Sequence, residues 1–257
     1  MTWIKKLLHL LAKPLSQKHK TWIWNLFIRI RYRIHTWLGE HENLLFSIYS
    51  WLNIYSEYAV SKDTDIVIDA FPRSGSTFSV YAFYLAQEQN AFKIAYHLHV
   101  PAHITRAIKL NKPALVIIRD PKSAVSSAVV RDSPLLIKEY LLRYRSFYLH
   151  LEPFLDQFVL ASFDQATNDL GLVIQKINQK YGTNFKEFEY TKENLVQIKY
   201  ELQQRQQQLG GNAHQSYLPN QAKQNAKQTV SFSKHESLLN QCEEIYQRYL
   251  DYLEKSK

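Results

Sequence analysis

The chain has 257 residues, of which 46% are hydrophobic and 21% charged, as expected of a globular protein with a core of its own. Its 32 Lys and Arg against 23 Asp and Glu leave a net charge of +9, which favours anionic partners. Cys242 is the only cysteine, which excludes an internal disulfide framework and a metal site built from cysteines, and is typical of a reducing compartment.

The first 60 residues differ from the rest and are expected to form a basic, Trp-rich helical extension. All five tryptophans lie within the first 51 residues, and before Glu40 there are eight Lys and Arg but no acid. Apolar residues at helical spacing predict three helices: residues 4–11, a second ending near Gly39, and residues 44–55. No apolar run approaches the roughly 18 residues of a membrane-spanning helix. The leucine run at residues 7–11 is too weak for a secretory signal peptide, so we expect a cytoplasmic protein.

Two interpretations of this extension stay open. The helices either pack against the domain that follows, or they form a surface on which Trp and Arg meet the headgroups of an anionic membrane. The second interpretation adds a peripheral membrane contact on the cytoplasmic face to the expected partners.

Residues 61–257 are expected to form an α/β domain. Strands are predicted at 65–71, 93–100, 115–119 and 158–162, and helices at 77–87, 121–131, 134–151 and 170–181. Strands separated by helices predict a three-layer sandwich with a central parallel sheet. The Gln- and Asn-rich stretch 203–228 is predicted to be a mobile connection before a last helix.

The first chemical signal follows the first of these strands, in the segment FPRSGSTF at residues 71–78. Ligands of parallel sheets collect at the carboxyl ends of strands, and a helix N-terminus presents N–H groups to an anion. Gly75 permits close backbone approach, and Arg73 adds a charged fork of donors. The segment therefore favours phosphate binding, although it lacks the G-x-x-x-x-G-K-[ST] spacing of an ATP-binding P-loop. The alternative is a capped helix with a surface arginine.

The second signal is the segment IRDPKSAVSS at residues 118–127, which follows the third strand. Asp120 is a suitable helix N-cap, and Pro121 suits the first helical position. Ser123 and Ser127 lie one turn apart, so a hydroxyl can join Arg119 around one anionic group. The alternative here is an Arg–Asp pair at a strand end. Together, the two segments predict a ligand with two separate phosphate-like groups.

Histidines lie between the two segments, in YHLHVPAH at residues 96–103. On a strand, His97 and His99 would share one face near the ligand, where histidine is suited to act as a base at neutral pH. A metal site on this pair is the alternative, although no third ligand is placed by the sequence. His103 is expected to begin the next helix and to contact substrate or solvent.

The paired segments resemble the bacterial type of the sulfotransferases that depend on PAPS (3′-phosphoadenosine-5′-phosphosulfate). FPRSGSTF is similar to their 5′-phosphosulfate loop, and IIRDPKSAVSS to their 3′-phosphate motif R-[DN]-P-x-x-x-x-x-S, with Arg119 and Ser127 at matching positions. The resemblance spans about residues 65–182, including VLASFDQATND, and does not cover residues 1–60. It implies the P-loop nucleotide-hydrolase-like sulfotransferase fold.

The resemblance also implies roles for individual residues. Leu98–Pro101 matches the family pattern T-H-L-P, so His99 is the expected base, with His97 at the position of an assisting Lys and Arg73 at the transferred group. A basic lid is implied at Lys223 and Lys227. The residues expected to bind PAPS are Arg73, Ser74, Gly75, Ser76, Thr77, Phe78, Arg119, Ser127, Phe163, Lys223 and Lys227. Three of them depart from the common pattern: Arg73 replaces Lys, Phe78 replaces Trp, and Phe163 replaces Tyr.

The expected function is transfer of a sulfuryl group from PAPS to a hydroxyl, by in-line attack with a histidine base and without a metal. The acceptor stays open among a glycan, a lipid-linked sugar and a small alcohol. One alternative is another P-loop enzyme, such as a nucleotide or small-molecule kinase, and another is a non-enzymatic basic module on a membrane surface. Nucleic acid is not expected as a partner.

Overall fold

The computed structural model describes residues 17–52, 57–87, 92–131, 135–208, 216, 218 and 220–255. The predicted helix at residues 4–11 therefore lies outside the described residues. Four parallel strands form one sheet in the order β2-β1-β3-β4. The strands are β1 (Ile66–Ala70), β2 (Ile94–Tyr96), β3 (Ala114–Ile118) and β4 (Val159–Ser162).

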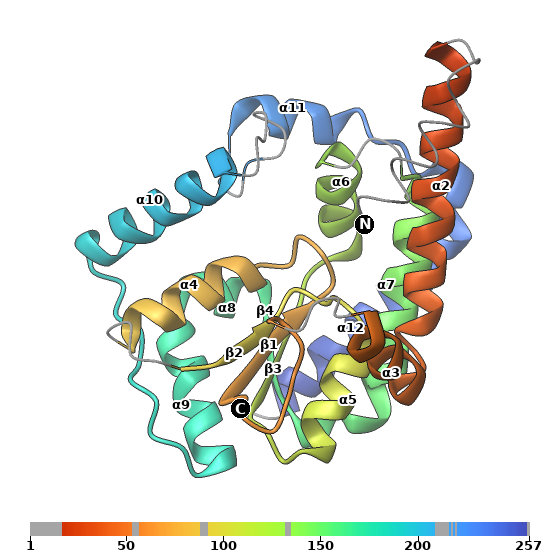
Figure 1. Ribbon diagram of the computed structural model, residues 1–257. Helices are drawn as coiled ribbons and strands as arrows, with labels where there is room; N and C mark the ends of the chain where they lie inside the picture. The colour runs from red at the N-terminus through yellow and green to blue at the C-terminus, as the bar shows by residue number, and fades with distance from the viewer. Residues whose placement is uncertain are drawn as a thin grey trace.

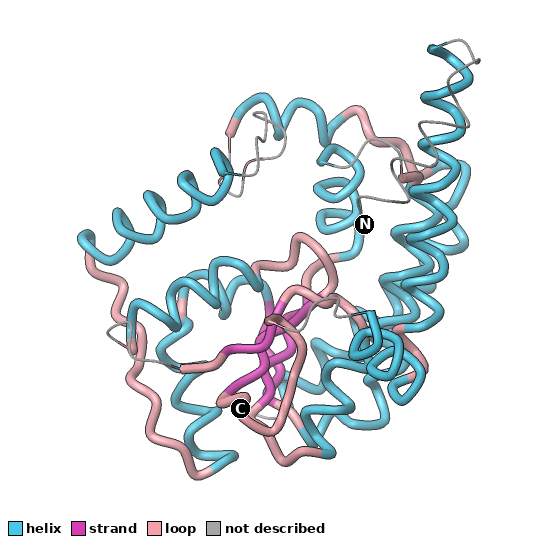
Figure 2. The backbone as a smooth tube through the Cα atoms, viewed as in Figure 1, coloured by secondary structure: helices cyan, strands magenta, loops and turns pink. Residues whose placement is uncertain are grey.

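Helices cover both faces of this sheet (Figure 1; Figure 2). Val67 and Val116 point into a core shared with α3, α5, α6, α7 and α12, whereas Ile68 and Leu115 point into a second core shared with α4, α8, α9 and α10. This alternation places a hydrophobic layer on each side of the sheet. The predicted α/β three-layer architecture with a central parallel sheet is confirmed.

The helices agree with the prediction in most of the chain. Their bounds are α2 (Gln17–Leu38), α3 (Glu42–Leu52), α4 (Ser76–Ala86), α5 (Pro101–Lys109), α6 (Pro121–Arg131), α7 (Ile137–Leu151), α8 (Phe163–Asn168), α9 (Leu170–Tyr181), α10 (Lys192–Gln208), α11 (Gln221–Gln228) and α12 (Glu236–Lys255). Short 3-10 turns lie at η1 (Glu152–Gln157) and η3 (Ser233–His235).

Part of the stretch predicted to be a mobile connection is helical. Its first residues complete α10, and its last residues form α11, where the Asn220 side chain accepts a hydrogen bond of 2.8 Å from the Lys223 amide. An N-cap of this kind satisfies one of the orphan N–H groups of a short helix that the apolar pattern does not reveal. Residues 209–215, 217 and 219 lie outside the described residues.

The second strand is shorter than predicted. β2 ends at Tyr96, and His97 and His99 both have positive φ, of 70° and 54°. The prediction that these two histidines share one face of a strand is therefore wrong. Leu98 and Val100, each of which follows one of the histidines, are buried in the core. The chain turns at each histidine, and both apolar side chains stay inside.

The N-terminal helices pack against this domain. Along α2, Arg33 forms an ion pair of 3.2 Å with Glu139 on α7, and the Tyr32 ring lies 5.4 Å from the Tyr140 ring. Glu42 of α3 accepts a hydrogen bond of 3.0 Å from Thr105 on α5. Buried residues of α3 belong to the same core as α5 and α7. The predicted division near residue 60 stays a prediction.

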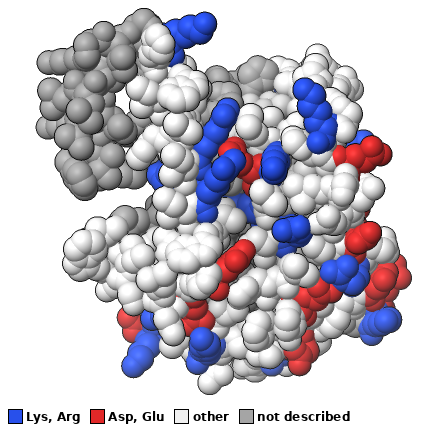
Figure 3. Space-filling view, turned by 90° about the vertical axis from the view of Figure 1, so that its right-hand side faces the viewer, with Lys and Arg blue, Asp and Glu red and all other residues white. Residues whose placement is uncertain are grey.

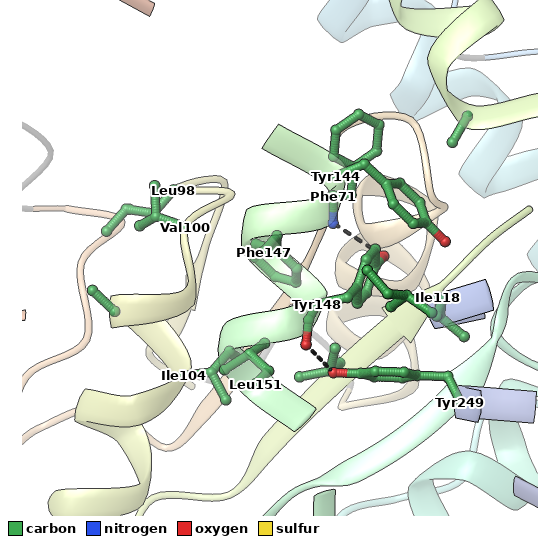
Figure 4. Packing of buried hydrophobic residues seen from close by; sticks show 14 of the residues in the cluster. Phe71, Leu98, Val100, Ile104, Ile118, Tyr144, Phe147, Tyr148, Leu151 and Tyr249 are labelled. Carbon is green, nitrogen blue, oxygen red and sulfur yellow. Dashed lines mark hydrogen bonds between the residues drawn. The ribbon is translucent and has the colours of Figure 1, made fainter. Parts of the chain in front are cut away.

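Tyrosines of α7 hold the ends of the central strands in place (Figure 4). The Tyr148 hydroxyl donates to the Ile117 carbonyl at 2.8 Å and accepts a hydrogen bond from the Phe71 amide at 3.4 Å. Tyr249 of α12 donates to the Tyr148 carbonyl at 2.7 Å. Tyr144 donates to the Arg119 carbonyl at 2.8 Å. Hydrogen bonds from buried tyrosines of α7 therefore hold the carboxyl ends of β1 and β3, and the loops that follow them, in place.

Candidate functional site

A cavity of about 1130 Å³ lies at the carboxyl ends of the strands, bounded by the loops after β1 and β3 and by residues of α2 and α11. The chain leaves β1 toward β2 with α4 on one face, and α5 returns on the other face to reach β3. The boundary between β1 and β3 is thus the point where the winding of the sheet reverses, which is where open α/β sheets bind ligands.

The loop after β1 presents the N-terminus of α4 to this cavity. Gly75 immediately precedes α4 with a φ of 94°, a left-handed conformation that favours glycine. A Cβ at this position would also lie 3.3 Å from the Phe163 ring. Ser74 and Ser76 are buried within the loop and first turn. The close turn leaves the first amides of α4 at the cavity, where they and the helix dipole favour an anion.

The loop after β3 interlocks with the loop after β1. The Asp120 side chain caps α6 by accepting a hydrogen bond of 2.7 Å from the Ser123 amide. Arg119 donates to the Arg73 carbonyl at 2.7 Å, and the Arg73 Nε donates to the Ser127 hydroxyl at 3.2 Å. Ser127 therefore meets Arg73 rather than Arg119, and the two predicted phosphate loops form one connected unit.

Two lysines of α11 complete a group of four cations around these loops. The Lys223 Nζ and the Arg73 guanidinium both donate to the Ser216 carbonyl, at 3.1 and 2.8 Å. Burial, together with the charges of Arg73, Lys227 and Arg119, lowers the pKa of Lys223 to about 7. Burial and the same arginines also lower the pKa of Lys227. Cations that lower one another's pKa values in this way form a site suited to a multiply charged anion.

Aromatic rings line one side of the cavity. The Arg119 guanidinium lies 4.0 Å from the centre of the Phe163 ring, and Phe78 contacts Phe188 with ring centres 6.5 Å apart. Phe163, Phe78 and Thr77 all line the cavity. An apolar face beside an arginine can accommodate a flat heteroaromatic ring.

His99 is held by a buried carboxylate. Its Nδ1 lies 2.7 Å from the Ala70 carbonyl and 3.2 Å from Asp69 Oδ1, and its backbone amide donates to Asp69 Oδ2 at 3.0 Å. A carbonyl oxygen only accepts, so Nδ1 carries the proton. The Nε2 atom of neutral His99 is therefore the atom with a lone pair. Arg143 donates to the His99 carbonyl at 2.8 Å and fixes the same loop.

Asp69 also binds a second histidine. His103 Nδ1 lies 2.7 Å from Asp69 Oδ2, and the Val60 amide donates to His103 Nε2 at 3.2 Å. Nε2 therefore accepts and Nδ1 donates, which makes His103 neutral. Burial raises the pKa of Asp69, but the hydrogen bonds from His103 and His99 outweigh it and hold this pKa below its usual value. Asp69 is thus an anion, and His103 is buried rather than facing substrate or solvent as predicted.

His97 lies beside His99, with ring centres 5.3 Å apart. Burial, with the charges of His99 and Arg205, lowers the pKa of His97 to about 3, so its ring is neutral near pH 7. Its Nδ1 is buried without a hydrogen-bond partner among the described residues. Within the part of the chain that the structure describes, no group of three or more His, Cys, Asp and Glu could hold a metal ion.

The structure brings the predicted residues together around one cavity. Lining it are Arg73, Gly75, Ser76, Thr77, Phe78, His97, His99, Arg119, Phe163, Lys223 and Lys227. Ser74 and Ser127 are buried behind this lining, the latter bonded to Arg73. Sequence reasoning missed Asp69, although an acid inside the apolar run DIVIDAF is a signal, because Asp is rarely buried without partners.

Residues of α2 and α7 also line the cavity, and sequence reasoning missed the contribution of α7. Ile28, Tyr32 and His35 of α2 and Tyr140 and Arg143 of α7 form part of the cavity wall. The Arg143 guanidinium lies 4.7 Å from the centre of the Tyr32 ring. Burial, with the charges of Arg143 and His99, lowers the pKa of His35 to about 3. This part of the cavity wall combines aromatic surface with the buried Arg143.

Comparison with known proteins adds little to this geometry. No family model matches the chain, and no curated protein matches its sequence. The solved structure of mouse sulfotransferase SULT7A1 complexed with PAP is similar over 57% of this chain and 67% of that chain, at 13% sequence identity and a TM-score of 0.37. A likeness at this level does not establish a family.

Proposed function

We propose that this protein is a PAPS-dependent sulfotransferase that transfers a sulfuryl group to a hydroxyl. The observation that carries the proposal is the convergence on one cavity of two anion-binding loops and a histidine held by a buried carboxylate. A basic module that only bound a membrane would need no base of this kind. A P-loop kinase would need a lysine after the loop glycine, where this chain has Ser76.

The residues around the cavity fit a nucleotide with two phosphate groups. The first amides of α4, together with Arg73 and the serines of its loop, offer donors to a 5′-phosphosulfate. Arg119 and the lysines of α11 offer positive charge to a 3′-phosphate. The Phe163 ring, stacked with Arg119, offers a face to the adenine. Each part of the ligand thus meets side chains of matching chemistry.

His99 is suited to be the base. The hydrogen bonds from Nδ1 to the Ala70 carbonyl and to Asp69 leave Nε2 to take a proton from an acceptor hydroxyl. Once His99 is protonated, the Asp69 carboxylate stabilises its positive charge, as the carboxylate does in a Ser-His-Asp triad. His97 is neutral near pH 7, so it can donate a hydrogen bond but does not supply the charge of the lysine at the corresponding position in the family.

PAPS, when bound, supplies the sulfuryl group and a good leaving group. As the acceptor oxygen bonds to sulfur, the bond from sulfur to the phosphate oxygen breaks, and the acceptor proton passes to His99 Nε2. Arg73 and the α4 amides stabilise the negative charge that stays on the phosphate oxygen. As in phosphoryl transfer, positioning and fixed charges supply most of the catalysis.

Calorimetric titration of the full chain with PAP, the desulfated product of PAPS, tests the nucleotide site. We expect PAP to bind at least tenfold more tightly than ADP, because ADP lacks the 3′-phosphate. In Arg119→Ala the preference for PAP should fall, since a charge-assisted hydrogen bond contributes about 1.5–3 kcal/mol. Arg119→Lys keeps the charge, so its preference for PAP should fall less than that of Arg119→Ala.

Turnover is measured with labelled PAPS against extracted glycans, lipid-linked sugars and small alcohols. Incorporation of label into a hydroxyl compound supports the proposal. Tight binding of ATP–Mg²⁺ with no preference for PAP would instead favour a kinase and overturn it.

A further inference from the structure

Helix α2 exposes large apolar side chains along one side. Trp22, Ile34 and Trp37 are 64%, 52% and 53% exposed, and Leu26 and Ile30 are exposed as well. We call the surface that these five residues form the outer stripe. Monomeric proteins rarely leave so many large apolar groups in one contiguous row facing water, and such rows mark interaction surfaces.

The outer stripe faces away from the rest of the molecule. Its members recur every three or four residues, so they lie on one side of the helix. Ile28, Tyr32 and His35, which line the cavity, also recur at this spacing but are offset by about half a turn. α2 is therefore apolar on two opposite sides, and the outer stripe contributes nothing to the cavity.

Positive charge accompanies the outer stripe. α2 itself contains five Lys and Arg and no acid, and of these Arg31 lines the cavity and Arg33 forms the ion pair with Glu139. Figure 3 looks onto the side of the molecule where α2 lies in Figure 1, and Lys and Arg predominate in the upper half of this face while most Asp and Glu lie lower. α3 adds Trp51, which is 84% exposed, to the apolar groups on this end of the chain.

We infer that the outer stripe of α2 docks on the surface of an anionic lipid bilayer. Tryptophan favours the interface between headgroups and acyl chains, and a basic helix with an exposed apolar side lies flat in that interface. Within the described part of the chain, no helix is long and apolar enough to cross a membrane, so α2 lies on the bilayer rather than spanning it.

Charge complementarity selects a bilayer over a second copy of this chain. Two copies meeting through this stripe would bring the basic residues of two α2 helices together, and α2 has no acid with which to compensate them. Anionic headgroups compensate the same cations, and each Lys or Arg near such a surface strengthens binding about fivefold. At 0.1 M salt this attraction acts over about 10 Å, so it affects the basic side chains of α2 once the outer stripe lies on the bilayer.

Flotation of the full chain with vesicles tests the inference. We expect co-flotation with phosphatidylcholine vesicles that contain about one third phosphatidylglycerol, weaker binding to phosphatidylcholine alone, and loss as salt rises. Replacing Trp22, Ile30, Ile34 and Trp37 together by Gln should lower partitioning at least about tenfold, because the apolar contact is lost. Brominated lipid should quench Trp fluorescence of the natural chain.

A matched control uses exposed apolar residues elsewhere. Leu172 on α9 and Val196 on α10 are 52% and 68% exposed. Leu172→Gln with Val196→Gln should leave vesicle binding unchanged. PAP binding of every variant, measured in parallel, reports that the domain is folded, and it does not depend on the acceptor or on turnover.

Two results would overturn the inference. One is a natural chain that stays with the aqueous fraction at low salt. The other is a dimer, seen by light scattering, that the α2 substitutions dissociate while vesicle binding is absent, since a second copy would then be the occupant of the outer stripe.

Discussion

Asp69 connects the strand β1 to the chemistry proposed for the cavity. Its carboxylate accepts hydrogen bonds from His103, from the His99 amide and from its neighbour's amide, and it lies 3.2 Å from His99 Nδ1. A buried carboxylate with this many donors fixes both the orientation of the His99 ring and the nitrogen that carries its proton. In the proposed mechanism, Asp69 is therefore a positioning residue that acts through His99.

Asp69→Asn should lower kcat about 10²- to 10⁴-fold, because the amide cannot stabilise a protonated His99 and can reverse its tautomer. PAP affinity should stay within about threefold, which also reports that the variant is folded. Asp65→Asn, just before the same strand and bonded to the Lys93 amide far from the cavity, is the control and should keep its turnover. A folded Asp69→Asn enzyme with normal kcat would exclude the positioning role.

The two histidines that line the cavity should differ in their contribution. His99→Ala should reduce turnover about 10²- to 10⁴-fold with little change in PAP affinity, as expected when a general base is lost. His97→Ala should reduce it less, because its ring is neutral near pH 7 and makes no hydrogen bond through Nδ1 among the described residues. If His97→Ala is the more damaging variant, the assignment of the base is wrong.

Lys223 should make nucleotide binding depend on pH. Its pKa of about 7 in the free protein means that it is mostly neutral above pH 7, whereas a bound phosphate favours the charged form. Binding then takes up a proton, so PAP affinity should fall between pH 7 and 9, by at most about tenfold per pH unit. Calorimetry on Lys223→Met should show weaker binding whose affinity falls less steeply with pH in this range, with Lys227, whose pKa is also lowered, accounting for the remainder. An unchanged slope in this variant would assign the proton to another group.

The sequence predicts these side chains better than the backbone that carries them. The residue types of the two segments predicted Arg73 and Arg119 as anion-binding residues, and the family resemblance implied His99 as the base; the structure places all three at the cavity. The backbone conformation of His97 and His99 was predicted wrongly. Alternation of polar and apolar residues favours a strand when no tertiary contact is considered. The contact that decides the outcome, between His99 and Asp69, joins residues 30 positions apart.

At the scale of elements, the turn between α2 and α3 supports the cavity. Gly39 follows the end of α2, its carbonyl accepts a hydrogen bond of 2.9 Å from the Ala102 amide, and a Cβ there would lie 2.6 Å from Val100 Cγ1. Val100 directly follows His99. The N-terminal helices are therefore coupled by packing to the loop that holds the proposed base.

Gly39→Ala should lower the free energy of unfolding by about 1–3 kcal/mol, because the added methyl group forces α2 and the His99 loop apart. It should also reduce turnover. Gly182→Ala is the matched control: its φ is 66°, and apart from its chain neighbours no atom of the described residues lies within 4 Å of the position that a Cβ would take. The substitution therefore adds only backbone strain of about 1 kcal/mol and should leave turnover intact. Urea unfolding and kcat of both variants provide the comparison. Equal effects of the two substitutions would show that the contact with Val100 is unimportant.

Elements with regular patterns are the ones that the sequence predicted well. The strands β1, β3 and β4 are apolar runs, and α6 and α9 have the predicted bounds. α8 and α11 were not predicted because they have six and eight residues and too little apolar surface to produce a periodic signal. α11 owes its place to its N-cap and to contacts of Lys223, which only the folded chain brings about.

At the scale of the whole molecule, charge and shape are arranged around the carboxyl edge of the sheet. Figure 1 shows α10 and α11 above that edge and α2 on the opposite side from α10. The cavity between them gathers Arg73, Arg119, Lys223 and Lys227, within a chain of net charge +9. Anionic nucleotides should therefore be attracted over a distance longer than direct contact.

PAP affinity should consequently fall as ionic strength rises. Raising the salt concentration from about 0.05 M to 0.3 M shortens the screening length and should weaken PAP binding several-fold to about tenfold, mainly through a lower association rate. Adenosine has no charge, so its weaker binding should not change with salt. Lys227→Met removes one half-exposed cation of the group and should flatten the salt dependence more than it changes affinity at high salt. Stopped-flow measurement of the association rate checks this directly. An association rate that is the same at both salt concentrations would contradict long-range attraction and leave only contacts inside the cavity.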